Sequence, residues 1–209
     1  MRHACAYRQP VKLFLIAISL LLPCGINAQT EPIKVPAEVE PFITKGMVPI
    51  ALETGDLNGD GTKDVILVLD KPFDEKAEID EAGESKRPLL IITRDASGKL
   101  WFAAQNDLVV YCRTCGGVFG DPFAGITLKG TSFTIDNYGG SADRWSYSYT
   151  FAYSRRDKTW QLTRVEVTTF NALDPNRTTR TRNYSPPKDF GLINFADFDP
   201  ENFRGKGKR

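Results

Sequence analysis

A strict alternation of side chains between residues 144 and 154 constrains the fold more than any other feature of the sequence. Every second position carries an aromatic ring, and small or hydroxyl-bearing residues stand between the rings. Successive side chains of a strand point to opposite faces of a sheet, so this pattern predicts a β-strand with one wholly aromatic face. Such a face is more often directed into a core than used as a platform for sugar rings. The aromatic residues are Trp145, Tyr147, Tyr149, Phe151 and Tyr153.

Period two also dominates the rest of the chain. Asp64–Asp70 and Pro88–Ile92 are short apolar runs, which are typical of strands buried on both faces at the centre of a sheet. Trp101 and Trp160 are expected to lie in the core. Further strands are expected at residues 99–104, 108–112, 126–128 and 133–138.

The C-terminal part of the pattern is less regular. Between Leu162 and Val165 the apolar residues of segment 159–170 change parity, which predicts a β-bulge. Residues 171–187 predict a loop with one edge strand, and residues 37–44 predict a short helical turn. No segment keeps a helical period for more than about two turns. We therefore expect a mostly β protein, built as an antiparallel sheet system or a sandwich.

The first 28 residues have the parts of a secretory signal peptide. A basic start precedes the largely apolar stretch Val11–Leu22, and the small residue Ala28 stands at the expected cleavage point. A membrane-spanning helix needs about 20 apolar residues, so a removable signal is favoured over an anchor. A lipoprotein acylated at Cys24 is an alternative that the preceding Pro23 disfavours. We expect a periplasmic or extracellular protein.

The balance of charged residues limits which classes of binding partner are expected. Three of the 27 Lys and Arg residues and none of the 26 Asp and Glu residues lie in the first 28 residues, so cleavage leaves a net charge of about −2. Nucleic-acid binding needs a clustered basic surface, and the basic run at residues 204–209 is typical of a flexible tail. We expect one β-rich domain over residues 29–203, without nucleic acid as a partner and without a transmembrane segment.

The only histidine, His3, lies in the signal segment. Its removal excludes Ser-His-Asp and Cys-His nucleophile pairs and zinc sites that need imidazole. The sequence therefore favours a non-catalytic protein, and we assign no catalytic residue.

Cys112 and Cys115 are the only cysteines outside the signal segment. In an exported protein this pair is interpreted first as a disulfide that staples a tight turn, worth roughly 2 kcal/mol for so short a loop. A redox-active pair is the alternative, but it normally has a helix N-terminus behind the first cysteine. A zinc half-site would need two more soft ligands.

Residues 55–64 contain the one strong local motif. Its oxygen donors stand at relative positions 1, 3, 5, 7 and 9, and Gly61 at position 6 supplies a sharp turn. A hard cation needs about six or seven oxygens, and three carboxylates in so short a segment repel one another unless a cation is bound. We expect calcium here; a metal-free turn held by side-chain hydrogen bonds is the alternative. The donors are Asp56, Asn58, Asp60, the Thr62 carbonyl and Asp64.

This motif is not an EF-hand, because Leu67 stands where the bidentate Glu would be. Its DxNxDGxxD pattern resembles the strand-loop-strand calcium loops of integrin-type FG-GAP repeats and their VCBS-like relatives over residues 51–70. A propeller would need several copies, so that architecture is not expected. Together with RPLLI, GDPFAGI and YGGSADRW, the loop resembles secreted bacterial proteins of unknown function that carry a single such motif. That resemblance implies a periplasmic or surface setting.

Two glycine-containing turns are weaker candidates. Asp143 and Arg144 follow a Gly-Gly pair between two expected strands, and they are candidate ligand-facing residues because loops carry function. A purely structural turn is the alternative. Residues 116–125 have the glycines of a phosphate loop but lack its Lys and Ser/Thr, so they favour a long turn.

Two acidic segments complete the candidates. Residues 71–87 predict a solvated loop. Asp197, Asp199 and Glu201 form a second acidic cluster, in which a glycosidase carboxylate pair is an open alternative because the separation of the carboxylates is a tertiary property.

These patterns lead to one main functional hypothesis, an exported, calcium-binding, non-catalytic β-protein that binds an envelope protein or glycan. A calcium-dependent carboxylate hydrolase acting on glycan or cell-wall material is one alternative. A secreted inhibitor or immunity-type protein is another.

Overall fold

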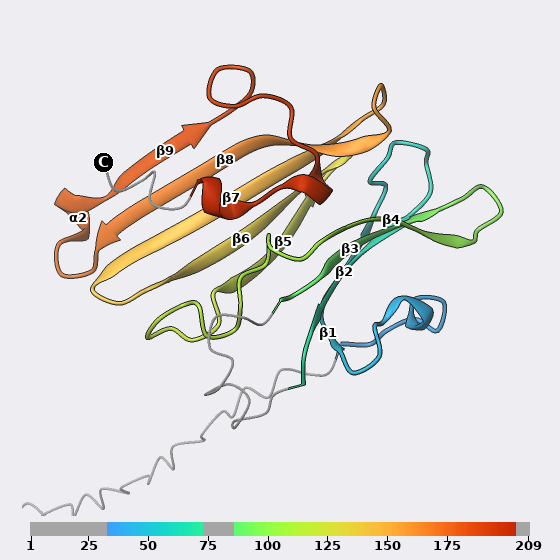
Figure 1. Cartoon of the computed structure of the whole chain (residues 1–209), viewed down its shortest axis with the longest axis horizontal. Helices are drawn as coiled ribbons and strands as arrows, with labels where there is room; N and C mark the ends of the chain where they lie inside the picture. Colours follow the sequence, from blue (N-terminus) through green and yellow to red (C-terminus); the bar gives the residue numbers. More distant parts are fainter. Residues whose placement is uncertain (1–32, 73–85, 204–209) are drawn as a thin grey trace, which may run out of the picture. The chain divides into compact units, whose positions relative to one another are not determined.

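The computed structural model describes residues 33–72 and 86–203; the expected signal peptide and basic tail lie outside these residues. The described chain is mostly β and forms two antiparallel sheets, as the alternating pattern predicts (Figure 1). No helix among these residues is both long and apolar enough to cross a membrane. The helical elements are short: η1 (Glu40–Phe42), α2 (Pro175–Thr178), η2 (Phe195–Asp197) and η3 (Pro200–Asn202).

The first sheet contains, in order, β1 (Val48–Gly55), β2 (Asp64–Asp70), β3 (Leu89–Arg94) and β4 (Leu100–Asn106). The two apolar runs of the sequence form β2 and β3, which occupy the central positions and are largely buried on both faces, as predicted. Ile66 and Val68 face the large core. Val65 and Leu67 face the other way and pack under the segment that contains η1, the expected helical turn.

The second sheet contains, in order, β5 (Phe123–Lys129), β6 (Ser132–Gly140), β7 (Asp143–Ser154), β8 (Thr159–Asn171) and β9 (Arg180–Tyr184). The alternating strand is β7, and its aromatic face is directed into the core: Tyr147, Tyr149 and Phe151 are buried. The register with β8 shifts between Thr150 and Phe151, which leaves Thr163 as the extra residue and confirms the predicted bulge. The predicted edge strand is β9.

The two sheets share one hydrophobic core. Ile66 and Ile91 of the first sheet belong to the same cluster of buried residues as Phe133 and Phe151 of the second. The ring of Phe151 packs edge-on against Phe195 of η2, with centroids 5.2 Å apart, so the C-terminal segment also contributes to this core. This arrangement is that of a β-sandwich.

The strand expected at residues 108–112 is wrong. These residues are mostly buried, but they form bends and irregular backbone instead of a strand. Asn106 Oδ1 accepts hydrogen bonds from the amides of Leu108 and Val109, both at 2.8 Å, and Asn137 Nδ2 donates to the Val109 carbonyl at 3.2 Å. Side chains therefore satisfy the buried backbone groups that a neighbouring strand would otherwise satisfy.

The expected core position of Trp101 is also wrong, whereas Trp160 lies in the core as expected. Trp101 is 50% exposed and lies on β4, an edge strand. Its indole Nε1 donates to Asp95 Oδ2 at 2.8 Å, and the Lys99 ammonium lies 3.9 Å from the ring centroid. Polar and charged groups of the adjacent β3–β4 turn hold this indole at the surface.

Candidate functional site

The candidate calcium loop, residues 56–64, joins β1 to β2 and has the tight turn geometry that its glycines predict. Gly59 and Gly61 adopt φ angles of 77° and 89°, a region that L side chains rarely enter. Asp56 closes the loop, because its Oδ1 accepts from the Gly59 amide at 2.7 Å and its Oδ2 from the Gly61 amide at 3.0 Å.

The other two carboxylates of the loop lie in contrasting surroundings. Asp60 is exposed, and hydrogen bonds from the hydroxyl and amide of Thr62, at 2.6 and 2.8 Å, lower its pKa. Asp64 is fully buried and accepts hydrogen bonds from the amides of Leu57 and Arg94 at 2.9 and 2.8 Å. Burial raises the pKa of Asp64, and the charges of Asp60 and Asp56 act in the same direction. The other two carboxylates of the loop therefore disfavour the charge of Asp64.

The calcium loop also contacts both sheets. Leu57 is fully buried in the shared core, and its carbonyl accepts a hydrogen bond from Trp160 Nε1 of β8 at 2.9 Å. On the other side, Thr62 Oγ1 donates to the Arg94 carbonyl at the end of β3 at 2.9 Å. A β-carbon added at Gly59 would lie 3.1 Å from the Arg155 guanidinium. Any change in the stability of the loop therefore acts on both layers of the sandwich.

The loop carries oxygen donors of the type that calcium binds. A carboxylate has about four acceptor positions. Hydrogen bonds use two of these on Asp64 and three each on Asp56 and Asp60, which leaves acceptor capacity on all three groups. Across residues 33–72 and 86–203, however, no three Asp, Glu, His or Cys side chains are gathered in a group that could hold a metal ion. The prediction of a calcium site therefore rests on the type of the oxygen donors and on their spacing in the sequence.

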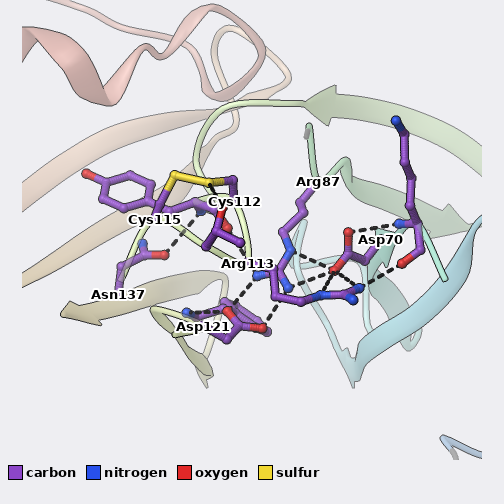
Figure 2. Close-up of polar contacts among 11 residues, drawn as sticks. Asp70, Arg87, Cys112, Arg113, Cys115, Asp121 and Asn137 are labelled. Carbon is purple, nitrogen blue, oxygen red and sulfur yellow. Dashed lines mark hydrogen bonds and ion pairs between the residues drawn. A yellow bond between two sulfur atoms is a disulfide. The ribbon is translucent and has the colours of Figure 1, made fainter. Parts of the chain in front are cut away.

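Cys112 and Cys115 form a disulfide, as expected, with their Cα atoms 5.1 Å apart (Figure 2). The bond closes a turn in which the Cys115 amide donates to the Cys112 carbonyl at 3.0 Å. The long turn expected at residues 116–125 follows the disulfide, with Gly117 and Gly120 at positive φ, but it ends at residue 122 because β5 begins at Phe123.

Sequence reasoning missed a buried ion-pair network beside this disulfide (Figure 2). Arg87 is 1% exposed and Asp70 is 2% exposed, and both Nε and Nη2 of Arg87 donate to Asp70 Oδ2 at 2.9 and 2.7 Å. Arg87 also makes a two-point contact with the Asp121 carboxylate, at 2.7 and 2.6 Å. Arg113, held in the disulfide turn, donates to the same Asp70 oxygen at 2.7 Å.

The arginines keep Asp70 ionised. Burial disfavours the charged carboxylate, but hydrogen bonds and positive charges from Arg87 and Arg113 outweigh it, so the pKa of Asp70 lies below its usual value. Burial likewise opposes the charge of Arg87, but its two carboxylate partners raise the pKa of this guanidinium. The network ties the end of β2 and the start of β3 to the disulfide turn.

The network corrects one part of the acidic-loop prediction. Residues 73–85 lie outside the described residues, but Arg87, assigned to the solvated loop, is buried. A signal for this was present in the sequence: Asp70 ends one run of residues buried on both faces, and Arg87 directly precedes the other. A buried charge is costly unless it is paired, so opposite charges at the ends of two neighbouring buried strands are expected to pair with each other.

Asp143 and Arg144, the candidate ligand-facing residues, begin β7 and line a pocket of about 540 Å³. The second acidic cluster makes local hydrogen bonds. Asp199 Oδ1 caps η3 by accepting from the Glu201 amide at 2.9 Å, and Asp197 Oδ2 accepts from Asn194 Nδ2 at 3.2 Å. Asp143 and Arg144 therefore line this pocket, and the acidic cluster does not.

Comparison of the chain with models of protein families, with curated proteins and with solved structures finds no match.

Proposed function

We propose that this protein is an exported, non-catalytic binding module whose two-sheet fold is stabilised by a calcium ion in the loop of residues 56–64. The observation that carries the proposal is the position of this loop, which bonds to β3 on one side and to β8 on the other. An ion held there would strengthen the junction between the two sheets.

The oxygen donors of the loop support calcium over softer metals. Calcium takes six to eight oxygen ligands from carboxylates, amides and backbone carbonyls. Asp56, Asp60 and Asp64 supply carboxylates with unused acceptor capacity, and Asn58 and the Thr62 carbonyl supply neutral oxygens. Bound calcium would supply positive charge at the point where these carboxylates repel one another. The role of the ion is structural.

Two observations support an exported binding module: the sequence lacks a common catalytic base, and the structure contains a disulfide. Beyond residue 28 the sequence contains no histidine, the usual general base near neutral pH. The disulfide Cys112–Cys115 agrees with an oxidising compartment, as does the signal-like N-terminal segment. The ligand class that we propose is an envelope protein or glycan.

The calcium part of the proposal is tested by comparing the melting temperature of the protein in about 1 mM calcium with that in excess chelator. A site with a Kd of about 10 µM would gain roughly 2.7 kcal/mol at that concentration, which corresponds to a rise of about 5–10 °C for a chain of this size. The Asp60→Asn variant removes one carboxylate charge from the loop. We expect the calcium-dependent rise to disappear in this variant.

Asp95→Asn is the matched control. Asp95 closes the β3–β4 turn with the same kind of bonds, accepting from the Ser97 amide at 2.8 Å and the Lys99 amide at 3.0 Å. Its loss should lower the melting temperature equally with and without calcium. Equal melting temperatures in calcium and chelator for the unaltered protein would show that the loop is a metal-free turn, and a calcium response kept in Asp60→Asn would place the ion elsewhere.

A further inference from the structure

Three loops meet at one end of the second sheet, the end that carries α2 and lies on the left in Figure 1. They are residues 116–120, the β6–β7 turn at residues 141–142, and residues 172–174 after β8. The Val118 amide donates to the Gly140 carbonyl at 3.2 Å, and the Ala172 amide donates to the Ala142 carbonyl at 2.7 Å. The β6–β7 turn therefore joins the other two loops into one continuous row, which we call the loop row.

The loop row places large apolar side chains in solvent. Leu173 is 88% exposed, Val118 is 76% exposed and Phe119 is 43% exposed. The turns at the opposite end of the same sheet, residues 130–131 and 155–158, contain only glycine, threonine and charged residues. A group of exposed apolar side chains at one end of a molecule is typical of a surface that binds another apolar surface.

Close packing of glycines holds the Val118–Phe119 tip in place. A β-carbon at Gly116 would lie 2.2 Å from the Gly120 carbonyl oxygen, and one at Gly117 would lie 2.8 Å from the Gly140 carbonyl oxygen. The Gly116 amide donates to the Gly120 carbonyl at 2.9 Å, and the Gly140 amide donates to the Gly116 carbonyl at the same distance. The glycine-rich turn therefore presents its apolar tip without the entropic cost of ordering a mobile loop on binding.

Positive charge surrounds the apolar tips. Residues 140–144 and 171–182 contain four arginines and two aspartates. The Arg144 guanidinium lies 4.5 Å from the Phe119 ring centroid, so this charge lies directly beside an apolar tip. The Arg177 side chain is 86% exposed. Apolar tips with a basic rim are complementary to a surface that is negatively charged outside and apolar beneath.

We propose that the loop row docks on the surface of an anionic phospholipid bilayer, with Val118, Phe119 and Leu173 inserted among the head groups and the arginines beside the phosphates. Arginine forms strong, charge-assisted hydrogen bonds with phosphate. Binding to a bilayer grows with the apolar area that is buried and with the attraction to anionic lipids. A lipid surface is a partner beyond the protein or glycan ligand of the proposed function.

A bilayer is favoured over a protein partner because the apolar side chains stand on separate loop tips. Protein interfaces need closely packed, complementary surfaces, and leucine and valine are under-represented among the residues that dominate their binding energy. The two most exposed apolar residues of the loop row are Leu173 and Val118. A fluid bilayer accepts such side chains without a matching pocket.

The test is co-sedimentation of the exported protein, in calcium, with vesicles of phosphatidylcholine alone and with vesicles that also contain the anionic lipid phosphatidylglycerol. We expect much tighter binding to the anionic vesicles. The double variant Val118→Ser/Leu173→Ser should bind them about tenfold or more weakly, because it removes apolar area that the bilayer would bury. Leu192→Ser is the matched control: this leucine is 58% exposed but lies outside the loop row, so its loss should leave binding unchanged.

Two exposed arginines form a second matched pair of variants. Arg177→Gln removes a charge beside the loop row, and each basic residue near an anionic bilayer strengthens binding by about fivefold. Arg156→Gln removes a charge from the β7–β8 turn at the opposite end of the sheet. The Arg156 side chain is 78% exposed and pairs with Asp157, as that of Arg177 pairs with Asp174. Only Arg177→Gln should weaken binding.

Each outcome decides the proposal. Binding to anionic vesicles that is weakened in the double serine variant and in Arg177→Gln, and kept in both controls, supports it. No binding to either kind of vesicle, binding that the double serine variant keeps, or an equal loss in Arg156→Gln overturns it. Sedimentation velocity without lipid tests the other occupant, because a dimer that the double serine variant converts to a monomer would show that the loop row contacts a second copy of the chain instead.

The calcium proposal stands or falls separately. The calcium loop lies at the opposite end of the second sheet, where a β-carbon added at Gly59 would lie 3.1 Å from the Arg155 guanidinium. We therefore expect the calcium-dependent rise in melting temperature to be the same in the double serine variant as in the unaltered protein.

Discussion

At the residue scale, the acidic side chains of this protein differ in what they do because their surroundings differ. Asp64 is buried, and its pKa is raised mainly by burial. Asp95 and Asp157 are exposed turn residues, and each has a pKa lowered to about 2. The sequence shows all three only as acids near turns. Burial of Asp64, and the hydrogen-bond donors that the fold brings to Asp95 and Asp157, decide the difference.

Asp95 gives a prediction for pH dependence. Hydrogen bonds from the Ser97 hydroxyl and the Trp101 indole, with others from the turn backbone, lower its pKa to about 2. An unfolded Asp titrates near 3.9, so the native turn binds the proton more weakly, and the stabilising contribution is present above about pH 4 and lost as the pH falls to about 2. Asp95→Asn should flatten the stability curve in this window. Urea unfolding at pH 2.5, 4 and 7 measures it, and an unchanged acid slope would contradict the assigned contacts.

At the element scale, hydrogen bonding by side chains explains where the sequence pattern succeeds and where it fails. The alternation of β7 and the apolar runs of β2 and β3 are local properties, and these strands form where they were predicted. The apolar segment 108–112 has the same local appearance, but Asn106 and Asn137 take its backbone bonds. Asn106 is a near neighbour in the sequence, but Asn137 comes from β6, 28 residues from Val109, so no local pattern reveals that partner.

The buried network gives an element-scale prediction, because it connects β2, β3 and the disulfide turn. Asp70→Ala would leave the 1% exposed Arg87 without its most buried partner, and breaking a buried pair in this way costs about 3 kcal/mol. Arg113→Ala leaves the Arg87–Asp70 pair intact and removes bonds from a 21% exposed side chain, so we expect a cost of about 1 kcal/mol. Urea unfolding of the two variants measures both values. Equal costs would show that Asp70 depends on Arg113 as much as on Arg87.

At the scale of the whole molecule, the fold class and the disulfide are predictable from sequence patterns, whereas the arrangement of the candidate sites depends on the tertiary structure. The DxNxDGxxD spacing identified the loop, but nothing in that spacing indicates that Leu57 reaches Trp160 in the opposite sheet. The sequence indicates Asp143 and Arg144 only as residues of a turn. Asn171, the partner of Asp143, and Phe170, a contact of Arg144, come from β8, so the pocket follows from the tertiary fold.

The central claim is that calcium in one loop stabilises both sheets, and amide hydrogen exchange followed by mass spectrometry tests it most directly. Amides that exchange only through global unfolding report the full stability of the fold. A gain of roughly 2.7 kcal/mol corresponds to exchange about a hundredfold slower in calcium than in chelator. We predict this slowing in peptides from β2 and β3 and equally in peptides from β7 and β8. Identical exchange in calcium and chelator, or slowing confined to residues 56–64, would contradict the account.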